Sequence, residues 1–194
     1  MNNSTFYQKA YKRHGISARG LNWNSEESQK IRFEIICDLL KDEISSNFIV
    51  DAGCGFGDFY MFLEEKKLIP KHYIGIDCIR DFIDISKQRL PHTIFTCRDI
   101  LKDELIYADW YIASGSLNIL SSFNTWMFLE KMLLYSRKGI VFNILIGDKN
   151  SKNFNYQKKE DIIQFAKKKR YKIRVIEGYL PNDISVEIKK WSSW

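Results

Sequence analysis

Three glycines at alternating positions follow an aspartate and a run of β-branched residues. Residues 49–59 read IVDAGCGFGDF, in which Asp51 belongs to the apolar run and Gly53, Gly55 and Gly57 come after it. Glycine lets the backbone turn sharply and approach a ligand without an intervening Cβ atom. The helix that follows would add free N–H groups at its first turn. This pattern predicts a ligand-binding turn between a buried strand and a helix.

The spacing of these glycines separates two classes of ligand. A dinucleotide-binding turn of the form G-x-G-x-x-G would carry its third glycine where the chain has Asp58. A carboxylate at that place would repel the pyrophosphate that a helix N-terminus should attract. An acidic residue inside the strand, Asp51, instead suits a ligand that carries an ammonium group. The pattern therefore disfavours NAD and FAD and favours a cationic ligand.

Strand-like and helix-like runs alternate along the chain from about residue 48. Near-continuous apolar runs separated by amphipathic ones indicate a parallel sheet covered by helices on both faces. The turn residues Pro181, Asn182 and Asp183 join the last two strand-like runs and predict a closing antiparallel hairpin. We expect an α/β, doubly wound fold with seven strands, at 48–53, 72–77, 93–99, 109–114, 139–145, 171–180 and 184–190, and helices at 57–67, 79–90, 125–136 and 156–169.

Residues 1–47 precede this alternating pattern and carry their own signals. An aromatic and basic stretch is followed by a turn near Gly15 to Gly20 and by an amphipathic helix from about Ser25 to Lys41. Ser25 suits the N-cap of that helix. No internal repeat or low-complexity linker occurs. We therefore expect one domain, in which residues 1–47 form an N-terminal helical segment and residues 48–194 hold the ligand.

Composition and charge exclude several other classes of protein. The chain has 194 residues, of which 45% are hydrophobic, enough for one full core. It contains no apolar run of about eighteen residues and no signal peptide, so we expect a cytoplasmic protein without membrane contact. The net charge of +6 is too small for a dedicated nucleic-acid binder. The cysteines show no CxxC pairing and indicate small buried thiols without a metal: Cys37, Cys54, Cys78 and Cys97.

The glycine segment resembles the first motif of the class I S-adenosylmethionine (SAM)-dependent methyltransferases, [D/E]-x-G-x-G-x-G. Here it reads DAGCGFG, from Asp51 to Gly57, and the resemblance extends over about residues 48–190. It is similar to the small-molecule members of that family in its closing segment, YLPNDISVEI. The resemblance implies a Rossmann-like fold, SAM as the cofactor and S-adenosylhomocysteine (SAH) as the product.

The resemblance also implies roles for residues at successive strand ends. Asp77 would accept hydrogen bonds from both ribose hydroxyls, and Asp99 would reach the adenine amino group. Ile100 would pack on the adenine ring, while Ser114 and Gly115 would line the wall near the sulfonium. The full set expected to bind the cofactor is Arg32, Asp51, Gly53, Cys54, Gly55, Asp77, Cys78, Asp99, Ile100, Ser114 and Gly115.

The N-terminal segment often folds over the cofactor as a lid in this family. His14 is then a candidate catalytic base or substrate contact, with a solvent-exposed histidine as the alternative. Arg32 could pair with the methionine carboxylate, or it could be a surface residue of its helix. Trp23 could close over the adenosine or belong to the acceptor pocket. His72 and His92 precede the second and third strands, so we expect them at the surface, at the opposite edge of the sheet.

The end of the fourth strand bears on the methyl acceptor. Family members that methylate amines of bases or glutamine amides commonly carry [D/N/S]-P-P-[Y/F] here, whereas this chain has SGSL, from Ser114 to Leu117. Methylation of that type is therefore disfavoured. Asn118 is a candidate catalytic residue that orients a substrate oxygen, and Asn143 could do the same from the fifth strand.

These features lead to one expected function and two alternatives. We expect transfer of a methyl group to a small oxygen-bearing metabolite, which can be anionic, by in-line displacement. An RNA or protein methyltransferase is one alternative, which only the basic net charge supports. A SAM-binding protein that has no turnover of its own and activates a partner is the other. The sequence specifies neither the acceptor nor the oligomeric state.

Overall fold

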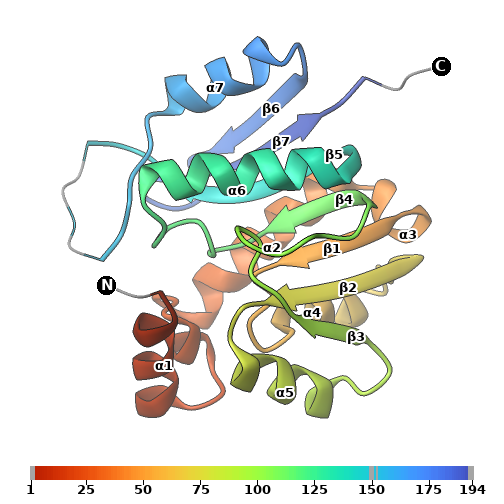
Figure 1. Cartoon of the computed structure of the whole chain (residues 1–194), viewed down its shortest axis with the longest axis vertical. Helices are drawn as coiled ribbons and strands as arrows, with labels where there is room; N and C mark the ends of the chain where they lie inside the picture. Colours follow the sequence, from red (N-terminus) through yellow and green to blue (C-terminus); the bar gives the residue numbers. More distant parts are fainter. Residues whose placement is uncertain (1–2, 149–150, 152, 192–194) are drawn as a thin grey trace.

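A single seven-stranded sheet forms the centre of the computed structural model, which describes residues 3–148, 151 and 153–191. The strand order is β3-β2-β1-β4-β5-β7-β6 (Figure 1). The first five strands run parallel, and β7 is antiparallel to both β5 and β6. Their bounds are β1 (Phe48–Ala52), β2 (His72–Asp77), β3 (Ile94–Cys97), β4 (Ala108–Ala113), β5 (Ser136–Leu145), β6 (Lys172–Glu177) and β7 (Asp183–Lys189). The predicted mostly parallel sheet with a closing hairpin is confirmed.

Helices cover both faces of this sheet, as the alternating pattern predicts. On one face, α6 (Ser122–Tyr135) and α7 (Lys159–Lys168) pack against inward-facing strand residues such as Val50. On the other, α2 (Glu26–Leu40), α4 (Asp58–Glu65) and α5 (Arg80–Arg89) pack against the neighbouring Ile49 and its counterparts. Figure 1 shows α6 in front of the sheet and α2 and α4 behind it. Because successive side chains of a strand point to opposite faces, a continuous apolar run serves both layers.

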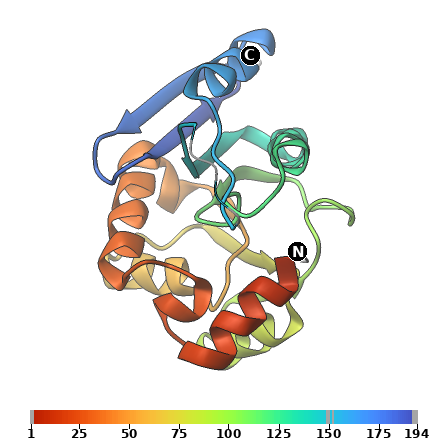
Figure 2. The ribbon, with the colours of Figure 1, turned by 90° about the vertical axis from the view of Figure 1, so that its left-hand side faces the viewer.

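The first part of the N-terminal segment lies at the edge where the parallel strands end. This part comprises α1 (Asn3–His14), a 3₁₀ turn η1 (Ala18–Leu21) and the start of α2. The arrowheads of β1, β2 and β4 point towards the side of α1, and Figure 2 views the molecule from that side, with α1 in the foreground. Ser25 caps α2 as predicted, because its hydroxyl accepts the Ser28 N–H at 3.1 Å while the Ser28 hydroxyl accepts the Ser25 N–H at 3.2 Å.

Two helix starts differ from the predicted ones by about three residues. α6 begins at Ser122, because the Ser121 hydroxyl accepts the Asn124 N–H and caps the helix early. α7 begins only at Lys159, because Gln157 pairs with the end of β5 instead. Its N–H donates to the Leu145 carbonyl at 2.9 Å. Side-chain caps and backbone pairing, neither of which changes the apolar period, thus set these two boundaries.

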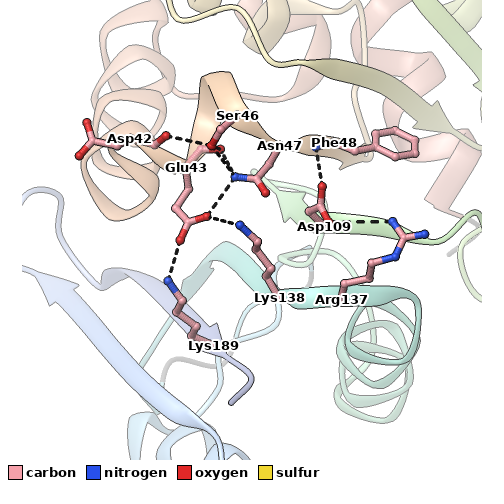
Figure 3. A network of polar contacts seen from close by, with 9 residues as sticks. All are labelled: Asp42, Glu43, Ser46, Asn47, Phe48, Asp109, Arg137, Lys138 and Lys189. Carbon is pink, nitrogen blue, oxygen red and sulfur yellow. Dashed lines mark hydrogen bonds and ion pairs between the residues drawn. The ribbon is translucent and has the colours of Figure 1, made fainter. Parts of the chain in front are cut away.

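Charged groups join the sheet and α3 (Glu43–Ser46) at the edge opposite the glycine turn (Figure 3). The Glu43 carboxylate accepts hydrogen bonds from Lys138 of β5 and Lys189 of β7, each at 2.8 Å. At the start of β1, Asp109 accepts the Phe48 N–H at 2.9 Å. Partial burial alone would raise the pKa of Glu43, but the two lysines dominate together and lower it to about 2.

Replacing Glu43 with glutamine is expected to destabilise the protein by about 1 kcal/mol at pH 7, since the lysines are partly exposed and solvent screens the pair. The lowered pKa stabilises the fold above the ordinary pKa of glutamate, and this contribution is lost as the pH falls through the folded-state value. Urea unfolding at pH 7 and pH 3 should therefore show a smaller difference between wild type and Glu43→Gln at pH 3. Glu26 forms an exposed pair with Lys30, and Glu26→Gln is the control. It should leave the unfolding free energy unchanged at both pH values.

Candidate functional site

The glycine turn after β1 is held against the end of β2. The N–H groups of Gly53 and Cys54 donate to the Ile76 carbonyl at 2.7 and 3.0 Å. Gly53 has φ +89°, and a Cβ atom there would lie 2.4 Å from the Cβ of Ser116. Gly57 caps α4 in the left-handed region. The turn therefore needs glycine for its conformation and for the close approach of the loop after β4.

Asp77 ends β2 directly beside this turn. Its Oδ2 accepts the Gly55 N–H at 3.1 Å and its Oδ1 accepts the Ile79 N–H at 2.9 Å. Burial outweighs these bonds and raises the pKa of Asp77 to about 6. Each carboxylate oxygen keeps a further lone pair, so the side chain can accept two more donors from a ligand.

Asp51 lies beneath the turn and is only 3% exposed. Its Oδ2 accepts the Tyr73 hydroxyl at 2.7 Å. Burial is the main reason that the pKa of Asp51 rises to about 7, and the nearby Asp77 adds to the rise. Within the described residues, neither carboxylate forms an ion pair with a lysine or arginine. The turn thus sits over two negative groups without a compensating cation.

Asp51→Asn is expected to stabilise the protein at neutral pH. A carboxyl whose pKa is raised on folding favours the fold only below its unfolded-state value, and this contribution is lost as the pH rises towards about 7. Asparagine can still accept the Tyr73 hydroxyl but carries no charge. The gain in unfolding free energy should be larger at pH 8 than at pH 5 by on the order of 2 kcal/mol. Equal gains at both pH values in urea unfolding would contradict the buried charge, and the exposed Asp84→Asn is the control.

A pocket of about 340 Å³ opens at this edge of the sheet. Its wall is made by α1, the segment 21–24, α2, the ends of the central strands and the turn 180–182. Its volume falls in the range of small-molecule sites. Among the residues expected from the sequence, those that line the pocket are Trp23, Arg32, Gly53, Asp77, Ser114, Gly115 and Asn118.

The other expected cofactor residues lie around the pocket rather than in its wall. Gly55 faces Leu21, whose Cδ1 would stand 2.8 Å from a Cβ atom at Gly55. Asp99 accepts the Leu101 N–H and pairs with Lys102 at 3.0 Å. Asp51, Cys54 and Ile100 are buried, and Cys78 is exposed.

The expectation of small buried thiols is correct for Cys54 and wrong for Cys78, while Cys37 and Cys97 are half-buried. Cys78 lies beyond the end of β2, where the chain leaves the sheet and the core no longer covers it.

His72 and His92 lie at the surface, as their positions before the second and third strands predict. His72 begins β2 and His92 precedes β3, and both side chains are exposed. His14 is the last residue of α1, and its exposed side chain is not part of the pocket wall. The structure therefore does not bring this candidate base to the pocket.

Arg32 is buried, so the alternative of a surface arginine is wrong. Its exposure is 8%, its guanidinium stacks on the Trp23 ring at 4.7 Å, and its Nε donates to Asp183 Oδ2 at 2.7 Å. Nη2 contacts the same oxygen. The hydrogen bonds that the described residues make to Arg32 leave Nη1 for a ligand. Sequence reasoning missed Asp183, which lies 151 positions away and reads as an ordinary turn residue.

Asn118 and Asn143 differ in the hydrogen-bonding groups that they leave free for a ligand. Asn118 is 6% exposed, and its Oδ1 accepts the Leu145 N–H at 3.0 Å, which leaves the amide nitrogen as a donor. Asn143 is fully buried and bonded on both sides, by Ser114 and to Ser185, so the expectation that it orients a substrate oxygen is wrong.

Aromatic residues of the N-terminal segment close the pocket from one side. Tyr7 lines the pocket and packs edge-on against Phe82, and its hydroxyl lies 3.5 Å from the Gly115 carbonyl. Phe6 makes a similar edge contact, at 6.2 Å, with Phe154 of the segment after β5. The alternation of aromatic and basic residues in residues 1–14 gave no signal for these partners, since they come from distant parts of the chain.

The described residues offer neither a cluster of metal ligands nor a membrane-spanning helix. No group of three or more histidine, cysteine, aspartate or glutamate side chains gathers there to hold a metal ion. Nor does any helix in that part of the chain have the length and apolar character needed to cross a membrane.

No protein-family model and no curated protein matches the chain. Solved structures match its fold over nearly its whole length. Magnesium protoporphyrin IX methyltransferase (ChlM) from Synechocystis PCC 6803 with bound SAM has a TM-score of 0.73 and 13% identity, over 98% of this chain and 98% of that one. Phosphoethanolamine N-methyltransferase 1 of Haemonchus contortus, in complex with phosphoethanolamine and SAH, has a TM-score of 0.75 and 15% identity, over 95% of this chain and 47% of that one. The DhpI–SAM–HEP complex has a TM-score of 0.72 and 10% identity, over 96% and 95%. The chain therefore has the fold that these SAM-dependent methyltransferases share.

Proposed function

We propose that the protein is a SAM-dependent methyltransferase. The observation that carries this proposal is the pair of carboxylates without a cation, Asp51 and Asp77, at a glycine turn that opens into a pocket. Burying such charges costs stability, and a ligand with ammonium and sulfonium groups would offset that cost. SAM carries both groups. Several solved structures that share the fold contain bound SAM or SAH, which supports the same ligand here.

The residues at the strand ends would each hold one part of the cofactor. Asp77 has lone pairs for the two ribose hydroxyls, and Asp99, with Cys78 and Ile100 beside it, would hold the adenine. Arg32 would offer Nη1 to the methionine carboxylate. Gly53 lies in the pocket wall, where the methionine chain would run against the backbone and over Asp51, whereas Leu21 covers Gly55 and would have to move for the ligand to reach that residue.

SAM supplies an activated methyl group on a positively charged sulfur. The chain's own contribution is to hold the acceptor in line with that group and to exclude water. The aromatic contacts of Phe6 and Tyr7 suit the second task, and we propose residues 1–47 as a lid. The ranges 1–47 and 48–194 include residues 1–2, 149–150, 152 and 192–194, which lie outside the described residues. His14 would act as a base only if the lid moved, because its side chain is exposed here.

The acceptor is proposed to be a small oxygen-bearing metabolite that can be anionic. Asn118 offers its amide N–H groups to a substrate oxygen. Arg32 is the one lysine or arginine among the described residues that line the pocket, which argues against an RNA substrate. The open pocket argues against a silent SAM-binding partner protein. A cytoplasmic enzyme of small-molecule metabolism is the corresponding biological proposal.

Calorimetric titration tests the cofactor, and labelled SAM tests the reaction. We expect SAM and SAH to bind and NAD to give no heat under the same conditions. Incubation with SAM that carries a labelled methyl group, together with fractionated cell metabolites, should then label a small molecule and neither RNA nor protein. Binding of NAD in place of SAM would refute the cofactor, while label in RNA or protein would refute the acceptor class.

A further inference from the structure

A chain of hydrogen bonds connects the pocket to the hairpin of β6 and β7. Ser114 Oγ, in the pocket wall, lies 2.7 Å from Asn143 Oδ1, and Asn143 Nδ2 lies 2.7 Å from Ser185 Oγ. Ser185 Oγ lies 2.8 Å from the Tyr179 hydroxyl, which lies 2.7 Å from Asp183 Oδ1. Asn143, Ser185 and Asp183 are each at most 2% exposed. Five side chains, from β5, β7, the loop after β4 and the turn between β6 and β7, thus form one polar network.

The carboxylate at the far end fixes the direction of the first bond. Asp183 pairs through its other oxygen with the Arg32 guanidinium, so it is ionised and can only accept hydrogen bonds. Burial raises the pKa of Tyr179 above its ordinary value, so its phenol keeps its proton. Tyr179 therefore donates to Asp183.

Each remaining bond follows from the one before it. Tyr179 has spent its only proton, so the Ser185 hydroxyl must donate to it and must accept from the Asn143 amide nitrogen. That choice turns Asn143 Oδ1 towards Ser114, whose hydroxyl donates to it. Ser114 thereby commits its only proton away from the pocket, and what it can offer to a ligand is a lone pair.

The aligned bonds also have an electrostatic consequence. Every hydroxyl and amide dipole in the chain points its positive end towards Asp183 and its negative end towards Ser114. Dipoles that point the same way polarise one another in a buried chain. The oxygen of Ser114 therefore favours a positive charge or a proton donor in the pocket and disfavours an anion.

We propose that this network makes Ser114 Oγ the subsite for the positively charged reacting centre of the ligand, with Asn143, Ser185, Tyr179 and Asp183 as its positioning residues. The inference rests on the proposed function, in which that centre is the methylated sulfonium of SAM. It adds a specificity: the site should distinguish a cation at this place from the neutral sulfur of SAH.

Two commercial ligands test the inference. Sinefungin resembles SAM but has a carbon with an ammonium group in place of the methylated sulfur, and SAH has an uncharged sulfur there. The measured quantity is the ratio of the two affinities in calorimetric titrations. Ser114→Ala should lower the preference for sinefungin by about tenfold, as expected when a hydrogen bond to a charged group is lost. Tyr179→Phe removes the hydroxyl that donates to Asp183, and it should lower the preference for sinefungin severalfold.

Matched controls remove the same groups elsewhere in the protein. Ser136→Ala deletes a buried hydroxyl that donates to the Leu133 carbonyl, and Tyr111→Phe deletes one that donates to Ile106. Both should leave the ratio unchanged. An unchanged ratio in Ser114→Ala, or equal losses for the two ligands, would overturn the inference. Failure of wild-type protein to bind SAH would instead refute the proposed function.

Discussion

Replacing Asp77 with alanine is expected to weaken the binding of SAM about 10- to 100-fold. Both oxygens of this carboxylate already accept backbone N–H groups, of Gly55 and Ile79, and each retains a lone pair towards the pocket. A ribose hydroxyl that donates to a charged group contributes about 1.5–3 kcal/mol. The alanine variant loses these bonds and also leaves the two N–H groups without their acceptor. Calorimetric titration with SAM measures the change directly.

Two variants separate the ligand contact from the support of the turn. Asp77→Asn keeps the size of the side chain and one oxygen acceptor, so its loss of affinity should be smaller than that of Asp77→Ala. The exposed Asp81, on the first turn of α5, serves as the control, and Asp81→Ala should bind SAM like the wild type. An Asp77→Ala protein that melts normally and binds SAM with unchanged affinity would refute the ribose assignment.

The same carboxyl should make SAM binding depend on pH. The pKa of Asp77 is raised to about 6 by burial, and hydroxyl donors of a ligand favour its charged form. Through Asp77 alone, the affinity should be constant between pH 7 and 8 and fall as the pH drops through about 6. Asp51 also titrates, near 7, so the comparison is best made in an Asp51→Asn background, with and without Asp77→Asn. The dependence should vanish in the double variant.

The sequence predicted the sheet and its binding edge because local patterns determine both. Each apolar run ends in a polar residue or a glycine, and parallel strands bring those ends to one edge, so Asp51, Gly53, Asp77 and Ser114 gather around one turn. The cap of α2 at Ser25 was equally local. What these signals share is that a few neighbouring residues suffice to produce them.

The partners of the site residues could not be predicted in this way. Arg32 meets Asp183 across 151 positions, and no spacing rule connects a helix residue to the end of the last strand. The late start of α7 is a similar case, since Gln157 leaves the helical pattern to pair with β5. The side chain of His14 does not reach the pocket, for the converse reason. The sequence places His14 in the N-terminal segment, but the direction of its side chain depends on how α1 packs on Phe56 and Phe82.

A variant with both Arg32→Gln and Asp183→Asn is expected to bind SAH about tenfold more weakly and 5′-methylthioadenosine with unchanged affinity. The second ligand contains the adenosine and the sulfur but lacks the amino-acid carboxylate. If Nη1 of Arg32 receives that carboxylate, a charge-assisted bond is lost for SAH alone. The double change is preferred, because Arg32→Gln by itself would leave Asp183 buried without a cation, at a cost of about 3–5 kcal/mol.

An ion pair beside the same turn provides the matched control. Arg89 pairs with Asp58 at 2.7 Å, and neither residue lines the pocket. The double variant Arg89→Gln, Asp58→Asn should therefore have no specific effect on the affinity for either ligand. Any change in affinity should be no larger than its loss of stability explains. Equal losses for SAH and 5′-methylthioadenosine in the Arg32 variant would show that the arginine supports the pocket wall through Trp23 and does not bind the carboxylate. SAH and 5′-methylthioadenosine share the adenosine and the sulfur, and only SAH carries the amino-acid part. A selective loss for SAH therefore requires a contact between the guanidinium and that part.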